Sequence, residues 1–255
     1  MPDGSSVRYE TDGRIGRVVL DRQDSMNSLD LELAVRLRRV LESVVASDVE
    51  ALVLTGAGRG FCAGGDIKAM AASGDAEAYL VELTREVHES IALLREMPVA
   101  VIARVNGPVA GGGLGLVLAA DISIASSGAS FTAAYGSVGL SPDCGVSALL
   151  PAAVGASRAR AFLLGGKRID ALAAQSWGVV SDVVEPSALD DAVSDTVDRV
   201  LRAGRASVAA TKALLSPDGA DFRRHLEREA GRIAHLAGST AATRIAAFAA
   251  SSRTL

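Results

Sequence analysis

The stretch Val105–Ser126 reads VNGPVAGGGLGLVLAADISIAS, and its succession of residue types indicates the fold. It is entered from Val99–Val105 (VAVIARV), a β-branched run that predicts a buried strand. Three glycines then lead into Leu114–Ala120, an apolar segment that predicts a helix, and Asp121–Ser126 (DISIAS) predicts the next strand. Strand, helix and strand in this order predict a βαβ crossover between parallel strands that are buried on both faces.

The same alternation continues toward the N-terminus. Short runs at Arg17–Leu20 (RVVL) and Ala51–Thr55 (ALVLT) predict two more strands. Between them, leucine and valine recur at helical spacing over about 29–44, and we expect Asn27 or Ser28 to cap that helix. The N-terminal part of the chain therefore predicts an α/β fold with a mostly parallel sheet.

The composition changes near Ser141-Pro142, and the chain beyond is mainly helical. One short strand is expected at Val179–Val184. The helices are Ala-rich and apolar for their length, a property that favours packing against other subunits. Predicted helices are about Glu77–Glu96 before this point, and Ser157–Leu164, Ala171–Trp177, Ser187–Ala203, Ala206–Leu215, Asp221–Leu236 and Thr240–Ala250 after it.

Composition excludes several function classes. The chain has 255 residues and a net charge of −4, and only 4% of its residues are aromatic, so neither nucleic acid nor an anionic membrane is an expected partner. Cys62 and Cys144 form no CxxC pair, and Met1–Glu10 lacks the apolar core of a signal peptide. The longest strongly apolar uncharged stretch, Val105–Ala120, is too short and too broken by glycine to span a bilayer. We therefore expect a soluble cytoplasmic protein.

Several common motifs are missing from the sequence. There is no GxxxxGK[ST] phosphate loop, no HExxH or paired-cysteine metal site and no GxSxG nucleophile turn. The cluster Gly111–Gly115 lacks the GxGxxG spacing of a dinucleotide site. Nucleotide, dinucleotide, zinc and serine-hydrolase functions are therefore disfavoured, and no metal site is expected.

Two glycine turns remain unusual. Phe61–Ile67 (FCAGGDI) follows the strand at Ala51–Thr55, and Asn106–Gly115 (NGPVAGGGLG) follows the strand at Val99–Val105. Ligands of open α/β sheets bind at the carboxyl ends of the strands, and glycine lets a ligand approach bare N–H groups. Two convergent backbone N–H groups would form an oxyanion hole. Alternatively, the glycines only permit tight strand–helix packing.

Four segments together resemble the crotonase superfamily, the enoyl-CoA hydratase/isomerase family, over about residues 14–250. They are GRGFCAGGDI (58–67), VNGPVAGGGLGLVLAADISIAS (105–126), GLSPDCG (139–145) and LLGGKRIDALAAQSWGVV (163–180). The resemblance implies a curved ββα spiral core in about residues 1–195 and a helical C-terminal trimerisation region in about 196–255. It also implies a homotrimer, or a hexamer built as a dimer of trimers.

The same resemblance implies an acyl-CoA thioester as substrate, with coenzyme A carried by the substrate and no separate cofactor. The oxyanion donors at the matching positions are the N–H groups of Gly65 and Gly112. Residues at matching positions for the adenine and pantetheine parts of coenzyme A are Met26, Asn27, Ala63, Gly64, Gly65, Asp66 and Ile67.

The carboxylates discriminate among reactions. The hydratases of this family use two glutamates, and this chain has Gly115 and Tyr135 in those places, which argues against efficient hydration. Asp143 stands where several isomerases and dehalogenases carry another catalytic carboxylate. A single carboxylate in an apolar pocket can move a proton and so shift a double bond. Asp143 could instead cap a helix that begins near Cys144, and the two roles can coexist.

Other roles stay open at this point. Tyr135 could be a core ring, line the acyl pocket or donate a hydrogen bond to the intermediate. His88 could be structural, or it could activate water in a hydrolase or dehalogenase whose nucleophile is Asp143. Besides the isomerase, the alternatives are a hydratase, such a hydrolase and a non-catalytic acyl-CoA binder. Asp66 and Asp121 match common family positions, and we interpret both as mainly structural.

The C-terminus departs from the family pattern. Family members often place a basic cluster after a phenylalanine here, where it contacts the phosphates of coenzyme A. This chain has Phe248 followed by AASSR (249–253), so most of that charge is missing. Arg22, Lys68 or Arg253 could compensate.

Overall fold

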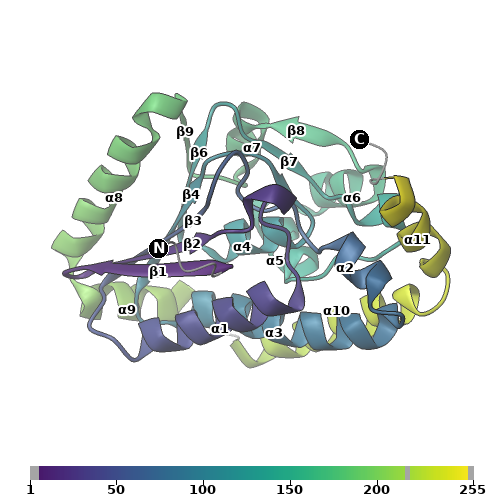
Figure 1. Cartoon of the computed structure of the whole chain (residues 1–255). Coiled ribbons are helices and arrows are strands. Elements are labelled where there is room, and N and C mark those ends of the chain that lie inside the picture. The colour runs from purple at the N-terminus through teal and green to yellow at the C-terminus, as the bar shows by residue number, and fades with distance from the viewer. Residues whose placement is uncertain (1–5, 216–218, 252–255) are drawn as a thin grey trace.

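A six-stranded sheet in the order β1-β2-β3-β4-β6-β9 runs through the molecule (Figure 1). The computed structural model describes residues 6–215 and 219–251. β1 pairs with β2 antiparallel, and every other neighbouring pair is parallel. The strands are β1 (Val7–Asp12), β2 (Ile15–Leu20), β3 (Ala51–Gly56), β4 (Ala100–Val105), β6 (Ile122–Ser126) and β9 (Asp182–Val184).

A second, smaller sheet has the order β5-β7-β8. Its strands are β5 (Val109–Ala110), β7 (Ser130–Thr132) and β8 (Arg168–Asp170). The chain leaves the large sheet after β4 to form β5, returns for β6 and leaves again for β7. This repeated crossing between two sheets, with α4 (Gly112–Ala119) between them in sequence, agrees with the expected spiral core.

Helices cover the outside of the sheets. In Figure 1, α1, α3 and α10 lie along the bottom of the view, and α3 packs against both of the others. Besides α4 the helices are α1 (Leu31–Val45), α2 (Ile67–Ala72), α3 (Ala76–Glu96), α5 (Val146–Val154), α6 (Ala156–Gly165), α7 (Ala171–Trp177), α8 (Leu189–Ala203), α9 (Arg205–Leu215), α10 (Gly219–Ala237) and α11 (Ala242–Ser251). Short 3-10 turns are η1 (Gln23–Ser25), η2 (Tyr135–Val138) and η3 (Pro186–Ala188).

The parallel strands are buried on both faces. In β3, Leu52 and Leu54 join the main core with α1 and α3, whereas Val53 belongs to a second cluster with Val193 and Val197 of α8. Successive side chains of a strand point to opposite faces, so β3 contributes to both cores. This double burial explains why the strand sequences are nearly continuous runs of apolar residues.

The N-cap predicted for α1 was wrong. Asp30, rather than Asn27 or Ser28, caps this helix, because its carboxylate accepts the N–H of Leu33 at 2.9 Å. Asn27 is fully buried in the left-handed region instead, with φ 58°. A short polar side chain tolerates that region better than most residues do.

The C-terminal helices are anchored to the sheet by a buried lysine. Lys212 of α9 donates to the carbonyls of Leu94 (3.0 Å) and Val99 (2.9 Å) and to the Asp121 carboxylate (2.7 Å). Asp121 also accepts the N–H of Val101, which supports its structural interpretation. Burial lowers the pKa of Lys212, and the Asp121 charge opposes that change. The expected division at 195/196 falls within α8, which packs on the sheet along its length.

A helix that crosses a membrane must be both long and apolar. None of the helices in residues 6–215 and 219–251 combines the length and the apolar character that crossing a membrane demands.

Candidate active site

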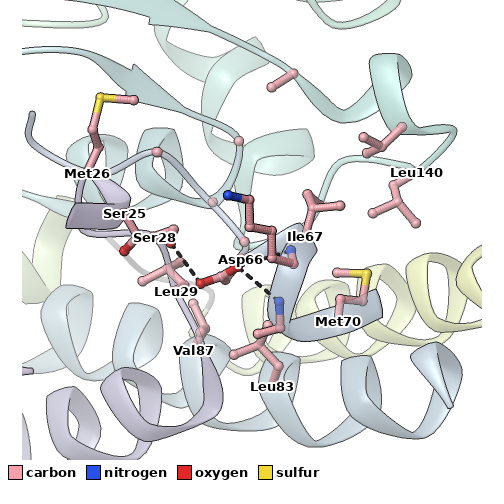
Figure 2. Close-up of a pocket in the computed structure, with 18 of the residues that line it drawn as sticks. Ser25, Met26, Ser28, Leu29, Asp66, Ile67, Met70, Leu83, Val87 and Leu140 are labelled. Atoms are coloured by element: carbon pink, nitrogen blue, oxygen red, sulfur yellow. Dashed lines mark hydrogen bonds between the residues drawn. The ribbon is translucent and has the colours of Figure 1, made fainter. Parts of the chain in front are cut away.

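A cavity of about 1260 Å³ lies where the two glycine turns meet the helices. Its wall includes Met26 and Leu29 before α1, Ile67 and Met70 of α2, and Val87 of α3, and Figure 2 shows these side chains around it. Ile233 of α10 and Phe248 of α11 also belong to the wall. The cavity is therefore mostly apolar and is built from segments that lie far apart in the sequence.

In the first glycine turn, the N–H group of Gly65 lies at this wall without a partner in the adjoining bridge. Leu29 donates its N–H to the carbonyl of Gly64 (2.7 Å), and Asp66 donates to the carbonyl of Leu29 (2.9 Å). In such a parallel bridge the backbone groups of Gly65, between these two, face away from Leu29. Gly64 has φ +85°, and a Cβ there would lie 2.7 Å from the carbonyl oxygen of Ala110. Only glycine fits that position.

The second glycine turn supplies another N–H group. Gly112 is the first residue of α4, and N–H groups of the first helical turn have no partner within the helix. The positive end of the α4 dipole faces the same point. Both Gly65 and Gly112 line the cavity. The structure thus brings together the two residues predicted as oxyanion donors.

Asp143 is the buried carboxylate of the cavity. The other described acidic residues in the wall, Asp21, Asp24 and Asp66, are partly or fully exposed. Burial raises the pKa of Asp143 from 3.8 to about 7, and the charge of Glu229 adds to that rise. Asp143 does not cap α5, whose N-cap is Gly145 with no side-chain cap. The capping interpretation of Asp143 was therefore wrong, and its carboxyl group is available for acid–base chemistry.

Tyr135 lies beside this carboxyl group. Its ring lines the cavity, and its hydroxyl donates to the backbone carbonyl of Asp143 at 3.2 Å. Burial, with the charge of Asp143, raises the pKa of Tyr135 well above its usual value. Tyr135 is therefore neutral, and its hydroxyl already donates a hydrogen bond. It combines two of its expected roles, those of a core ring and of a pocket-lining residue.

His88 of α3 is not part of the described cavity wall, and it binds the backbone of the segment that carries Asp143. Its Nε2 accepts the N–H of Cys144 at 3.1 Å. Burial lowers the pKa of His88 to about 4, and a hydrogen bond with the backbone of Leu226 opposes that shift. A neutral imidazole with both nitrogens engaged supports the structural role of His88.

One group of side chains has the atom types of a metal site. Among the described residues, the potential ligand atoms of His88, Asp143 and Cys144 lie within 4.8 Å of one another. Zinc would need a free imidazole nitrogen and a thiolate. Here Nε2 of His88 already accepts a hydrogen bond, and burial raises the pKa of the Cys144 thiol well above its usual value. The donor set does not fit a metal ion.

Gly115 has no room for a side chain. A Cβ at this position would overlap the carbonyl oxygen of Cys144 and lie 2.7 Å from the Cys144 Cβ. Gly115 stands where the hydratases of the resembled family carry a glutamate. In this chain the backbone of Cys144 occupies the space that such a glutamate would need.

The residues expected to hold coenzyme A divide into two groups. The described wall includes Met26, Ala63, Gly65, Asp66 and Ile67. Asn27 and Gly64 lie behind it.

Asn27 shapes the loop that carries these residues. Its Oδ1 accepts the N–H of Arg22 (2.9 Å), and its Nδ2 donates to the carbonyls of Ala57 (3.0 Å) and Gly60 (2.9 Å). Asn27 thus positions the loop from the interior.

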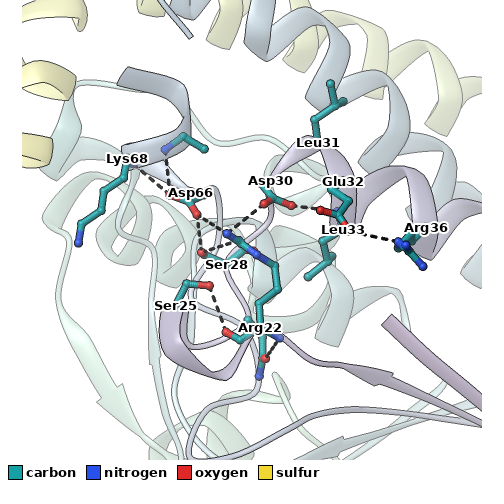
Figure 3. A network of polar contacts seen from close by, with 12 residues as sticks. Arg22, Ser25, Ser28, Asp30, Leu31, Glu32, Leu33, Arg36, Asp66 and Lys68 are labelled. Carbon is teal, nitrogen blue, oxygen red and sulfur yellow. Dashed lines mark hydrogen bonds and ion pairs between the residues drawn. The ribbon is translucent and has the colours of Figure 1, made fainter. Parts of the chain in front are cut away.

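Asp66 connects this loop to α2. Figure 3 shows its carboxylate between Arg22, Ser28 and the first turn of α2. Burial raises its pKa, but the N–H of Ala69 and the Arg22 guanidinium outweigh that effect and hold the pKa of Asp66 below its usual value. Arg22 is also paired with Asp30 at 3.0 Å. Lys68 lines the cavity, and Arg253 lies outside the described residues.

Glu229 was not predicted from the sequence. It lies on the buried face of α10 and accepts the N–H of Gly145 (2.7 Å) and of Ser147 (3.0 Å). Leu226, Glu229 and Ile233 share one face by their helical spacing. A carboxylate within an apolar stripe was the signal that could have revealed it.

Comparison with known proteins identifies the family. Residues 10–242 match the family model described as enoyl-CoA hydratase/isomerase. A probable enoyl-CoA hydratase of Mycobacterium leprae is 38% identical over 227 residues, which cover 84% of this chain and 76% of that protein. The 1,2-epoxyphenylacetyl-CoA isomerase of Escherichia coli K12 is 36% identical over 188 residues, which cover 72% of this chain and 70% of that protein.

Solved structures are similar over nearly the whole chain. An enoyl-CoA hydratase from Bacillus halodurans has a TM-score of 0.90 and 26% identity, and the match covers 95% of this chain and all of that one. An enoyl-CoA hydratase from Mycobacterium avium subsp. paratuberculosis has a TM-score of 0.87 and 29% identity, covering 97% and 96%. The glycine turns, the cavity and these similarities together show that the chain belongs to the enoyl-CoA hydratase/isomerase family of the crotonase superfamily.

Proposed function

We propose that the protein shifts a carbon–carbon double bond of an acyl-CoA thioester, with Asp143 as the proton-transferring group. The Asp143 carboxylate removes a proton from C2 of a 3-enoyl thioester, and the electron pair moves onto the thioester oxygen. The N–H groups of Gly65 and Gly112 stabilise this enolate oxygen. The protonated Asp143 then delivers a proton to C4, which leaves a 2-enoyl thioester. One carboxylate suffices, because the group that removes the proton at C2 also donates the proton at C4, and its proton can exchange with solvent in between.

The observation that carries this proposal is the position of Asp143 at the cavity wall with a pKa of about 7. A general base is most effective when its pKa lies near the working pH. Cys144, the next residue, lies against Gly112, because a Cβ on Gly112 would be 2.9 Å from the Cys144 Sγ. Base and oxyanion donor therefore belong to adjoining segments.

Two observations disfavour the alternative reactions. Hydration in this family needs two carboxylates, and the place of one is filled at Gly115 by the Cys144 carbonyl. Hydrolysis with Asp143 as nucleophile needs a base for water, and Nε2 of His88 already accepts the Cys144 N–H. The isomerase uses only groups that face the cavity.

The experiment is turnover of defined thioesters in D₂O. A trans-3-enoyl-CoA is expected to give the 2-enoyl-CoA and to exchange hydrogen at C2 and C4. Because a relative is named for it, 1,2-epoxyphenylacetyl-CoA belongs in the same panel. Release of free CoA would instead support the hydrolase, addition of water the hydratase, and binding without any turnover the acyl-CoA binder.

The proposal includes coenzyme A as part of the substrate, with no resident metal or redox cofactor. Activity and acyl-CoA binding are then expected to survive dialysis against a chelator, and loss of both would contradict it. We also propose a homotrimer or a hexamer as the working assembly, supported by exposed apolar side chains on the later helices. These are Leu164, Leu172, Leu214, Leu215 and Phe248.

A further inference from the structure

The turn that carries Asp143 is strained. Cys144 has φ 55° and Gly145 has φ 75°, so two consecutive residues adopt the left-handed conformation. A non-glycine residue in that region is strained and persists only where surrounding contacts hold it. The contacts here come from two helices: His88 of α3 accepts the Cys144 N–H, and Glu229 of α10 accepts the Gly145 N–H.

Glu229 makes the larger set of these contacts. One carboxylate oxygen accepts the N–H of Gly145 at 2.7 Å, and the other accepts both the N–H (3.0 Å) and the hydroxyl (2.5 Å) of Ser147. All three donors favour an ionised acceptor. Burial holds the pKa of Glu229 above its usual value, and these donors limit that rise. Glu229 therefore caps the N-terminus of α5 from another helix. This end of α5 carries the positive end of the helix dipole and has no side-chain cap of its own.

A chain of hydrogen bonds leads from Glu229 outward. Arg228 can only donate, so the contact of its Nη2 with Nδ1 of His225 at 3.0 Å makes Nδ1 an acceptor. Nε2 of His225 then carries the proton and donates to Ser147 Oγ at 2.7 Å, and Ser147 donates to Glu229. His225 has 28% of its side chain exposed. The ionised Glu229 is thus supported from the solvent side.

The remaining titratable groups that face Asp143 are neutral near pH 7. Burial raises the pKa values of Tyr135 on η2 and of Cys144, and raises that of Cys62 to about 12. Burial lowers the pKa of His88 on α3 to about 4. From α10, the Glu229 carboxylate lies close along the turn, because it accepts the N–H of Gly145, two residues after Asp143, at 2.7 Å; His225 lies on its other side. Among the described groups around Asp143, Glu229 is therefore the one that brings a negative charge.

We propose that Glu229 is a positioning residue: it holds the Asp143–Ser147 turn in its strained form, and its charge sets the pH range in which Asp143 accepts a proton. This inference rests on the proposed function only in taking Asp143 as the proton-transferring group. Removing the charge makes the Asp143 carboxyl more acidic, and hence a weaker base, because a like charge nearby disfavours ionisation.

The test is a direct titration of Asp143 that needs no turnover. The protein is labelled with ¹³C at the aspartate carboxyl carbons, and the Asp143 signal is assigned by its loss in Asp143→Asn. In Glu229→Gln we expect the midpoint to fall by about 1 pH unit, the lower end of the effect of a nearby charge. Glu227→Gln is the matched control: Glu227 is exposed on the same helix, and its substitution should leave the midpoint unchanged.

Glu229→Gln could fail to fold, because its amide places an NH₂ group against one of the three donors. A second variant keeps the proposal testable in that case. Ser147→Ala keeps the Glu229 carboxylate and the Ser147 N–H but removes the hydroxyl donor. Glu229 then takes up a proton more readily, and we expect a smaller fall in the Asp143 midpoint. An unchanged midpoint in Ser147→Ala, together with a Glu229→Gln protein that is either unshifted or unfolded, overturns the proposal.

Turnover separates this proposal from the isomerase assignment. If the protein isomerises enoyl-CoA, the acidic limb of its kcat profile should move with the titration midpoint, whereas a purely structural role lowers kcat equally at every pH. A shifted Asp143 midpoint in a protein without isomerase activity would retain the role of Glu229 and reject the isomerase. An active isomerase in which folded Glu229→Gln has an unshifted Asp143 midpoint would retain the isomerase and reject the role of Glu229.

Discussion

At the scale of single residues, the proposed function gives Asp143 the role of proton-transferring group, and the structure gives it no helix to cap. α5 starts at Val146 and receives its side-chain acceptor from Glu229, so an amide at 143 removes no cap. We expect Asp143→Asn to fold and to bind acyl-CoA with similar affinity. Turnover should fall by about 10²- to 10⁴-fold, the usual contribution of a positioned acid–base group. Steady-state kinetics with calorimetric binding checks both, and a folded variant with full activity would remove Asp143 from the mechanism.

The same residue makes stability depend on pH. The pKa of Asp143 is about 7 in the folded protein and about 3.9 in an unfolded chain, so between these values the folded state binds more protons. The contribution of Asp143 to stability therefore decreases as the pH rises from about 4 to about 7. Asp143→Asn should be more stable than the parent at pH 8, by on the order of 2–4 kcal/mol, and should match it near pH 4. Denaturant unfolding at both pH values measures the difference; equal stability at pH 8 would contradict it.

At the scale of elements, the first glycine turn offers a matched pair of substitutions. A Cβ on Gly65 meets nothing within 4 Å, because it enters the cavity, and its φ is not in the left-handed region. Gly65→Ala should therefore keep its melting temperature and lose acyl-CoA affinity or turnover. Gly64→Ala should unfold at a lower temperature, since its Cβ would press on the Ala110 carbonyl at φ +85°. Thermal melts with turnover assays test the pair, and a destabilised Gly65→Ala would show that this turn is structural only.

The elements that the sequence predicted well are those with a local pattern. Helical periodicity located α1, α3 and α6 to α11 to within a few residues, and apolar runs located β2, β3, β4 and β6, whereas α2, α5 and β1 were not predicted. The two glycine turns could be located because each directly follows such a strand. The strands β5, β7 and β8 have only two or three residues each, too few for a periodic signal, and were not predicted.

Those residues of the candidate site that lie in local sequence patterns could be predicted. Those whose role depends on long-range contacts could not. Gly65, Gly112 and Asp143 lie in motifs that can be read locally, Tyr135 was found at a family position between two of them, and all four line the cavity. The role of Glu229 depends on contacts with residues more than 80 positions away, which no local pattern encodes. Asp30 could not be preferred over Asn27 as the cap of α1 without knowing which backbone carbonyls Asn27 contacts.

At the scale of the whole molecule, the exposed apolar side chains predict assembly. Leu164 is 87% exposed, and Leu214 and Leu215 of α9 are 81% and 78% exposed. Isolated exposed leucines are common, but several on the later helices favour a subunit interface. Sedimentation at micromolar concentration should give a trimer or a hexamer. Leu214→Glu with Leu215→Glu should shift that equilibrium toward the monomer if α9 takes part, and a monomeric parent protein would contradict the assembly itself.

The residues of the cavity wall range from Asp21 to Phe248, so segments more than two hundred positions apart in the sequence enclose the same space. On the ribosome, the glycine turns and the sheet emerge long before α10 and α11 are synthesised. A nascent chain therefore has Gly65 and Gly112 in place while the cavity is still open to water on the side that Ile233 and Phe248 later close. Under the proposed function, the thioester can be enclosed only after α11 has docked, so the activity would arise late in the synthesis of this part of the chain.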